Sequence, residues 1–346
     1  MRPLNLALQG GGSHGAYTWG VLDALLEDGR VDFEAITGAS AGAINAVLLA
    51  EGWRRGLAAG TDPRETARER LEVFWTGLGQ QANPFALAAH WPFAAGAGIA
   101  NPVMQWLDLV SRLWSPYQLN PWNINPLRDH LARQVDFDAL RAAPPMKLFL
   151  CATNVKTGRI RIFREGELTI DMPLASACLP FVFQAVQIVN DHGREPVVDA
   201  FWDGGYMGNP ALWPLFYATR CRDLLLVQIN PIARDEVPDT ATEIAERVSE
   251  ISFNASLLHE MRAIQFVQRL LAEGKLDPTR YRKVYLHRIA SEDEMQRFGA
   301  SSKYNTAPAF LRQLFNTGRA AAAQWLEQKL EYVGHAGTVR IAEEFL

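Results

Sequence analysis

The sequence predicts an α/β fold: a three-layer sandwich in which helices cover both faces of a mostly parallel central sheet, followed by a mainly helical C-terminal extension. Short apolar runs typical of buried strands alternate with helical patterns through the first two thirds of the chain. Two of these runs lead directly into glycine-rich turns that open a helix. No low-complexity linker divides the 346 residues, of which 48% are hydrophobic, so one substantial core is expected.

The first strand, predicted over residues 4–8, runs into a glycine loop that precedes a helix at 17–26. The loop reads Gly10-Gly11-Gly12-Ser13-His14-Gly15. Three adjacent glycines expose consecutive backbone N–H groups, and the helix N-terminus adds partial positive charge, so the loop suits an anion. Because its first, third and sixth residues satisfy G-x-G-x-x-G, that anion is either a dinucleotide pyrophosphate or the oxyanion of a tetrahedral acyl intermediate.

A serine turn follows the second strand pattern, at 33–37, and precedes a tightly packed helical pattern at 43–50. The turn reads Gly38-Ala39-Ser40-Ala41-Gly42. Its small residues let strand and helix approach closely, which suits a nucleophile exposed at the tip of a sharp turn. A dinucleotide site would need an acidic residue at the end of this strand, whereas Asp32 and Glu34 stand at its start. The two motifs together therefore favour acyl transfer.

A third motif, Trp202-Asp203-Gly204-Gly205, comes directly after the apolar run at 196–200. An aspartate at a strand end can accept the serine proton directly, the work that histidine does in a triad. Asp191 and Asp199 are rival carboxylates, but paired glycines follow neither of them. We therefore prefer Asp203 as the base. The exits of the three strands would gather the glycine loop, Ser40 and Asp203 at one edge of the sheet.

Taken together, the three motifs resemble those of the patatin-like phospholipases, a family of serine acyl hydrolases with a Ser-Asp dyad and no catalytic histidine. The resemblance extends over residues 4–231 and includes 175–180, which is similar to the helix-and-proline segment before the family's aspartate strand. It implies that Ser40 is the nucleophile and Asp203 the general base. The implied oxyanion donors are the backbone amides of Gly10, Gly11 and Gly12. The implied supporting residues of the loop and turns are His14, which stands where arginine or lysine is usual, Gly15, Gly38, Gly42, Gly204 and Gly205.

The predicted catalytic domain spans 1–232, and further strand patterns lie at 147–153 and 224–229, with a hairpin formed by 159–163 and 167–170. Residues 83–126 form an insertion that carries four of the ten tryptophans and a helical stretch at 103–114. This insertion is either a lid or acyl-binding surface, or a helix packed on the core.

The C-terminal extension, 233–346, has helical spacing at 244–258, a strand-like run at 283–286 and a helix around Trp325. It resembles the helical extensions of some bacterial patatin-like proteins. We expect it to pack on the same unit, where it would cap the fold or mediate oligomerisation, for example as a homodimer.

Composition limits the partners and the compartment. A net charge of −4 without basic runs gives no reason to expect nucleic acid, and the histidines show no paired metal-ligand spacing, so neither a metal nor a cofactor is expected. Three widely spaced cysteines favour reduced thiols, and no secretory signal pattern precedes the first strand, so a cytoplasmic location is expected. No stretch has the roughly 20 apolar residues that span a bilayer.

The sequence thus predicts a serine acyl hydrolase that cleaves carboxylic esters of lipids, with phospholipase A or lysophospholipase activity, and that contacts a membrane or lipid aggregate peripherally. Three alternatives remain. One is an esterase with a Ser-His-Asp triad that uses His259 or His287. The second is a protein without catalysis that binds lipid or acts as a scaffold, and the third is a dinucleotide-binding protein that uses the glycine loop.

Overall fold

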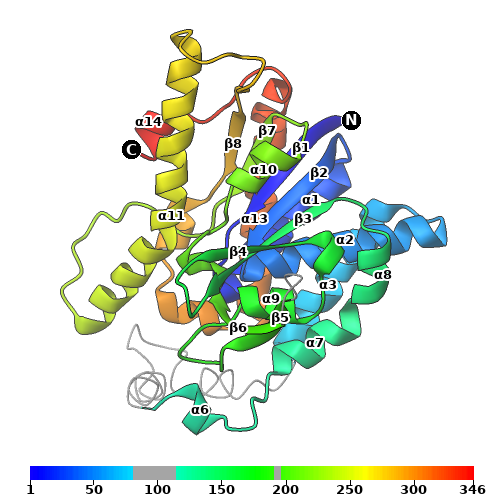
Figure 1. Ribbon diagram of the computed structural model, residues 1–346, viewed down its shortest axis with the longest axis vertical. Coiled ribbons are helices and arrows are strands. Elements are labelled where there is room, and N and C mark those ends of the chain that lie inside the picture. Colours follow the sequence, from blue (N-terminus) through cyan, green and yellow to red (C-terminus); the bar gives the residue numbers. More distant parts are fainter. Residues whose placement is uncertain (81–113, 191–195) are drawn as a thin grey trace.

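The structure, a computed structural model, describes residues 1–80, 114–190 and 196–346. The eight strands found in these ranges form one twisted sheet (Figure 1). Its order is β5-β6-β3-β2-β1-β7-β8, and β4 pairs with β3 beside that path. The strands are β1 Arg2–Leu8, β2 Val31–Ala39, β3 Lys147–Asn154, β4 Ile160–Arg164, β5 Val186–Asn190, β6 Val197–Asp203, β7 Asp223–Val227 and β8 Tyr285–Ile289.

Five neighbouring strands, β3-β2-β1-β7-β8, run parallel to one another. The other three are antiparallel: β4 and β6 both pair with β3, and β5 pairs with β6. The predicted mostly parallel sheet is therefore confirmed. The strand patterns at 4–8, 33–37, 147–153 and 224–229 correspond to β1, β2, β3 and β7.

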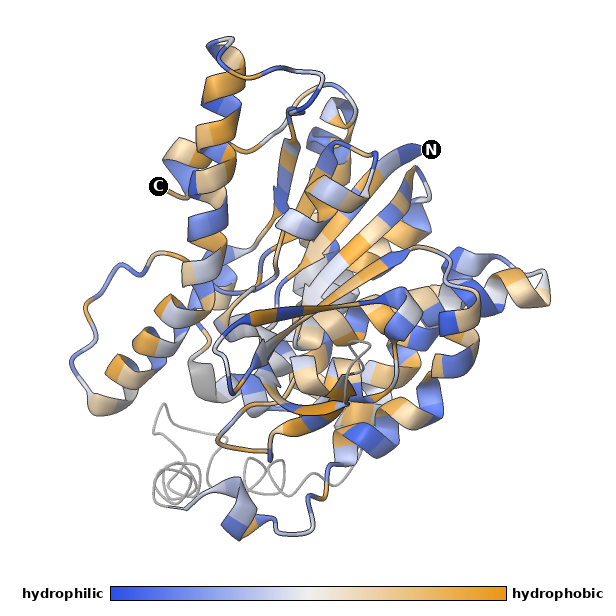
Figure 2. Cartoon of the chain, in the orientation of Figure 1, coloured by the Kyte–Doolittle hydropathy of each residue, from blue (hydrophilic) through white to orange (hydrophobic). Residues whose placement is uncertain are grey.

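Helices cover both faces of the sheet, which gives the three predicted layers (Figure 1). Alternate residues of β1 point to opposite faces, so that Leu6 and Leu8 join one core and Ala7 joins the other. Figure 2 shows hydrophobic residues concentrated in the central strands and the helices over them. The first core is covered by α1 Gly15–Asp28, α2 Ala41–Ala59, α3 Pro63–Gln80 and α13 Pro308–Gln328. The second is covered by α10 Trp213–Ala218, α11 Ala241–Ala272 and α14 Ile341–Glu344. The shorter helices are α6 Pro116–Leu119, α7 Pro126–Gln134, α8 Phe137–Ala142, α9 Asp171–Ser176 and α12 Glu292–Gln296.

The C-terminal extension contributes to both the sheet and the helical layers. Its three predicted elements are present as α11, β8 and α13, and β8 lengthens the parallel part of the sheet beside β7. Helix α13 packs closely on α1 because glycines occupy the contact on both helices. A Cβ on Gly20 would overlap the Phe315 carbonyl oxygen, and one on Gly318 would overlap that of Tyr17.

The hairpin expected at 159–170 differs in the structure, and most of the insertion at 83–126 lies outside the described residues. The predicted hairpin between 159–163 and 167–170 is wrong, because β4 pairs with β3 instead. Residues Glu165–Glu167 form a 3-10 turn that Glu167 caps by accepting the Arg164 N–H at 2.8 Å. The helix expected at 103–114 and most of the insertion lie outside the described residues. Of the helices in the described ranges, none is long and apolar enough to cross a bilayer.

Candidate active site

Ser40 is the single residue between β2 and α2, in a strained backbone conformation. Its φ of 52° and ψ of −122° lie in a region that side chains other than glycine rarely adopt. The turn is held on both sides: the Ser40 N–H donates to Ser176 Oγ at 2.9 Å, and its carbonyl accepts the Ile44 N–H at 3.1 Å. Strain that is held in place this way is characteristic of a nucleophile at a strand-to-helix turn.

The glycines that flank Ser40 permit the close approach of three elements. A Cβ on Gly38 would lie 2.6 Å from the carbonyl carbon of Gly42, and one on Gly42 would overlap the Leu8 carbonyl at the end of β1. A Cβ on Gly15, at the start of α1, would lie 2.6 Å from that of Ala41. Only glycine therefore fits at these three positions. The absence of side chains there lets the start of α2 pack directly against β1 and α1.

The glycine loop lies directly against Ser40. A Cβ on Gly10 would come within 2.6 Å of the Ser40 Cβ, and Gly12 has a φ of 59°, which favours glycine. The Gly10 N–H, however, donates to Asn209 Oδ1 at 2.7 Å, so in this arrangement it is not free to bind an oxyanion. Within the described ranges, the N–H groups of Gly11 and Gly12 have no acceptor in the hydrogen-bond network.

The N-terminus of α1, behind this loop, lies inside the protein. Every residue from Gly15 to Leu26 is buried, and Trp75 as well as Ala41 packs against Gly15. The carbonyl of Lys303 lies over Gly12. A pyrophosphate bound at a helix N-terminus needs open space there, so this geometry does not favour a dinucleotide.

Asp203 reaches the same edge of the sheet on an antiparallel strand. Strand β6 pairs with only the last three residues of β3, and it ends with Asp203 opposite Ala152. The neighbouring β3 residue, Cys151, is opposite Ala39, which directly precedes Ser40. The short overlap therefore brings the end of β6 level with the end of β2, although the two strands run in opposite directions. Gly204 and Gly205 follow without a gap, and a Cβ on Gly204 would overlap the Cys151 carbonyl.

The Asp203 carboxylate is fully buried and firmly held. The backbone N–H of Asp203 donates to the Cys178 carbonyl at 2.8 Å, and its backbone carbonyl accepts from Thr153 Oγ1 at 2.8 Å. Carboxylate oxygen Oδ1 accepts the Gly205 N–H at 2.8 Å. Oδ2 has no hydrogen-bond partner of normal geometry among the described residues. A buried carboxylate oxygen that is free in this way is available to accept a proton.

Burial raises the pKa of Asp203 to about 7, since desolvation disfavours the charged form. The Gly205 N–H, the Ser40 hydroxyl and the charge of Lys303 each oppose that rise. The Ser40 hydroxyl is thus close enough to influence Asp203, even without a fully formed hydrogen bond. A base with a pKa near neutrality combines an ionised fraction with useful proton affinity.

Two of the three histidines considered for other roles, His14 and His287, have partners elsewhere. His14 is buried, its Nε2 lies 2.7 Å from Ser302 Oγ, and burial followed by the charge of Lys303 lowers its pKa to about 3. His14 is therefore neutral rather than a cation. Nε2 of His287 lies 3.1 Å from Asp223 Oδ1 inside the fold, and His259 is exposed on α11. These contacts do not favour the triad alternative.

Sequence reasoning did not identify four polar residues that support the site. Ser176 and Asn209 accept backbone N–H groups of Ser40 and Gly10, as described above. Asn230 donates through Nδ2 to the Gly10 carbonyl at 2.8 Å, and Lys303 Nζ donates to Asn230 Oδ1 at 2.8 Å. Ser176 lies in the 175–180 segment, which offered a signal for its region but not for its role. The other three carry no local motif.

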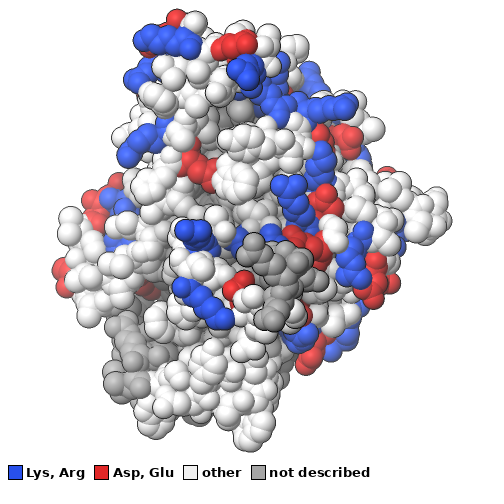
Figure 3. Space-filling view, viewed as in Figure 1, with Lys and Arg blue, Asp and Glu red and all other residues white. Residues whose placement is uncertain are grey.

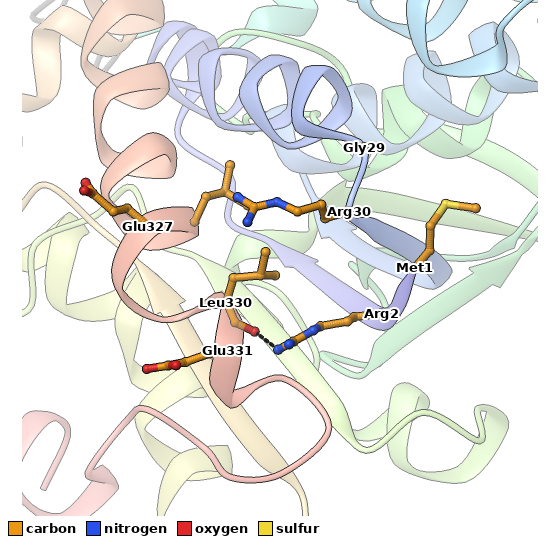
Figure 4. Close-up of a pocket in the computed structure, with 8 residues that line it drawn as sticks. Met1, Arg2, Gly29, Arg30, Glu327, Leu330 and Glu331 are labelled. Carbon is orange, nitrogen blue, oxygen red and sulfur yellow. Dashed lines mark hydrogen bonds between the residues drawn. The ribbon is translucent and has the colours of Figure 1, made fainter.

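A cavity of about 490 Å³ lies elsewhere, beside the first residues of β1 and the end of α13 (Figure 4). It is lined by Arg2, which donates to the Leu330 carbonyl, and by Arg30 and Glu331. Since the glycine loop follows the opposite end of β1, this cavity is at the wrong edge of the sheet to hold the substrate of Ser40.

The family model for patatin-like phospholipase matches residues 6–216. No curated protein matches the chain. Among solved structures, VipD from Legionella pneumophila is 15% identical with a TM-score of 0.38, over 91% of this chain and 67% of that one. The heterodimeric ExoU-SpcU complex from the type III secretion system of Pseudomonas aeruginosa contains a chain that is 19% identical with a TM-score of 0.33, over 95% of this chain and 52% of that one. The chain therefore spans about two thirds of the first structure and about half of the second.

Proposed function

Because the chain belongs to the patatin-like phospholipase family, we propose that it is a serine acyl hydrolase that cleaves carboxylic ester bonds of lipids through a Ser40-Asp203 dyad. The observation that carries the proposal is the placement of both residues at one edge of the sheet. A strained serine turn lies there beside a glycine loop, together with a buried carboxylate whose Oδ2 is unpartnered. Each feature has a role in ester hydrolysis.

In the first step, Asp203 takes the proton of the Ser40 hydroxyl as Oγ attacks the ester carbonyl carbon. The N–H groups of Gly11 and Gly12 stabilise the resulting oxyanion, while Asn209 and Asn230 hold Gly10 in place behind them. When the tetrahedral intermediate collapses, the alcohol leaves with the proton from Asp203. Ser40 then carries the acyl group.

In the second step, Asp203 takes a proton from water as the water oxygen attacks the acyl carbonyl. Collapse of this second intermediate releases the carboxylic acid and returns the proton to Ser40 Oγ. No histidine takes part, in keeping with the partners of His14 and His287 inside the fold.

The substrate class is proposed to be a lipid presented at an interface. Large apolar side chains are exposed around α6, where Trp122 is 83% exposed. The lower end of the face in Figure 3, which includes α6, carries few charged side chains. Such apolar side chains can enter the boundary of a lipid layer. The exposed residues of this segment are Trp114, Tyr117, Leu119, Trp122 and Ile124.

The test is hydrolysis by the purified full chain of a short soluble ester and of vesicles that contain phospholipid, lysophospholipid or neutral acylglycerol. We expect release of fatty acid that is lost in Ser40→Ala and retained in Ser252→Ala, a matched change of an exposed serine on α11. Absence of hydrolysis from the whole panel, or equal activity of Ser40→Ala, would contradict the proposal. Thermal stabilisation by a dinucleotide would favour the binding alternative instead.

A further inference from the structure

Lys303 reaches the glycine loop from the far end of the sequence. It belongs to the 3-10 turn Ala300–Tyr304, in the C-terminal extension. Its backbone carbonyl lies over Gly12, at the distance where only glycine fits. Its Nζ donates to Asn230 Oδ1 at 2.8 Å, and Asn230 in turn donates to the Gly10 carbonyl. One residue of the extension therefore contacts the loop through both its backbone and its side chain.

The charge of the same ammonium also acts on Asp203. Nζ is 5.7 Å from the centre of the Phe253 ring. That ring packs against Gly205, whose N–H binds Asp203 Oδ1. Lys303 is thus linked by contacts to both members of the dyad. Asn230 and Gly10 connect it to Ser40, and Phe253 lies between it and the turn of Asp203.

Three carboxylates stabilise the charged form of Lys303. Glu250 lies nearby on α11, but it is already paired with Arg234 and Arg247. Glu246, also on α11, and Asp203 are the other carboxylates that stabilise the ammonium. Within the described ranges Lys303 forms no direct ion pair, and burial of its ammonium lowers its pKa. Among the residues that the structure describes, the other titratable groups that interact with Asp203 are the Cys151 and Cys178 thiols and Tyr206, whose pKa values burial raises, so that they stay neutral.

We propose that Lys303 is a positioning residue of this active site, which fixes the glycine loop through Asn230 and presents a positive charge that favours the ionised form of Asp203. The inference rests on the proposed function of Ser40 and Asp203. His14 lies in the loop itself but is neutral and turned toward Ser302, so it does not supply that charge. The C-terminal extension is thereby part of the catalytic unit.

The test is the pH dependence of kcat and KM for a soluble ester, from pH 5 to 9, in Lys303→Met and Lys303→Arg. We expect Lys303→Met to lower kcat about tenfold or more with KM nearly unchanged, because the loop and the base act in the transition state. Without the cation the pKa of Asp203 rises, so the acidic limb of the profile moves up by about half a pH unit or more. Lys303→Arg should restore the position of the limb. Lys275→Met is the matched control, because Lys275 is an exposed lysine just beyond the end of α11.

Two different failures can be told apart. If the wild-type protein shows no hydrolysis that depends on Ser40, the proposed function itself is wrong. If the wild type is active and folded Lys303→Met keeps both its kcat and its acidic limb, Lys303 has no such role. A loss of kcat that Lys303→Arg shares, without movement of the limb, would indicate packing alone and also overturn the inference. If circular dichroism shows that Lys303→Met does not fold, Lys303→Gln, which keeps a donor for Asn230, replaces it. The position of the acidic limb of its pH profile is then compared with that of the wild type.

Discussion

Replacement of Asp203 by asparagine should make the protein more stable at alkaline pH while it abolishes turnover. Asp203 is completely buried, and its pKa in the folded protein is about 7, against an ordinary value of 3.8 for an aspartate in water. Above pH 7 the carboxylate is ionised in both the folded and the unfolded protein, and folding must then bury a charge. Below about pH 4 it is protonated in both, and this penalty vanishes. Stability is therefore lost as the pH rises from about 4 to about 7.

The size of the penalty follows from the shift. About three pKa units correspond to about 4 kcal/mol, which is the upper value for the gain on neutralisation. Asparagine keeps an oxygen that can accept the Gly205 N–H, and its amide faces the Ser40 hydroxyl as the carboxylate did. We therefore expect Asp203→Asn to raise the free energy of unfolding by about 1–4 kcal/mol at pH 8 and by less than about 1 kcal/mol at pH 4.5.

Urea unfolding followed by tryptophan fluorescence measures this difference at the two pH values, provided that the slopes with denaturant agree. Asp199→Asn is the control, because Asp199 is only partly buried and lies four residues earlier on β6. The reasoning fails if Asp203→Asn is less stable than the wild type at pH 8, or if its gain is the same at both pH values.

Three further predictions concern the loop, the serine turn and the lipid surface. Gly11→Ala should lower kcat by about 10²- to 10³-fold with little change of KM, because an oxyanion donor is displaced; unchanged kcat would remove Gly11 from that role. Ser176→Ala leaves the buried Ser40 N–H without its acceptor, so a thermal melt should show a loss of about 1–3 kcal/mol, and an unaltered Tm would refute the support assigned to Ser176. Trp122→Ala should reduce hydrolysis of vesicles but not of a soluble ester, whereas Tyr217→Ala, equally exposed on α10, should change neither; a parallel loss on both substrates would argue against interfacial contact.

The parts of the fold and site that the sequence predicts are those with local signals. Ser40 and Asp203 could be proposed as the dyad because each stands in a turn whose glycines are close to it in sequence. The strands β1, β2, β3 and β7 could be identified because buried parallel strands form continuous apolar runs. Local pattern was sufficient for these elements.

The remainder depends on contacts between distant parts of the chain. The position of Gly10 in the glycine loop predicts that its N–H binds an anion, yet the acceptor of this N–H is Asn209, which no motif marks. The false hairpin arose because 167–170 alternates like a strand, whereas Glu167 instead caps the turn that follows β4. Lys303 is 291 residues beyond Gly12, and only the path of the extension over the loop brings them together.

The direction of β6 could not be predicted from the sequence either. The expected gathering of strand ends assumed parallel strands, but β6 is antiparallel and overlaps β3 by only three residues. Apolar runs specify burial, not direction, so the pattern at 196–200 fits both orientations. The sequence predicts that Asp203 lies near Ser40 because it assumes parallel strands. In the structure β6 is antiparallel, and its short overlap with β3 is what brings the two residues to the same edge.

The most direct test of the Ser40-Asp203 dyad is mass spectrometry of the protein during reaction with a fluorophosphonate, with the labelled peptide and its rate of formation compared among variants. We predict one adduct on Ser40, absent from Ser40→Ala, formed at least about 10²-fold more slowly in Asp203→Asn, and formed within about tenfold of the wild-type rate in His287→Gln. An adduct on another residue would contradict the account. So would a folded His287→Gln that does not react while Asp203→Asn reacts at the wild-type rate, because that result would assign the base to a histidine triad.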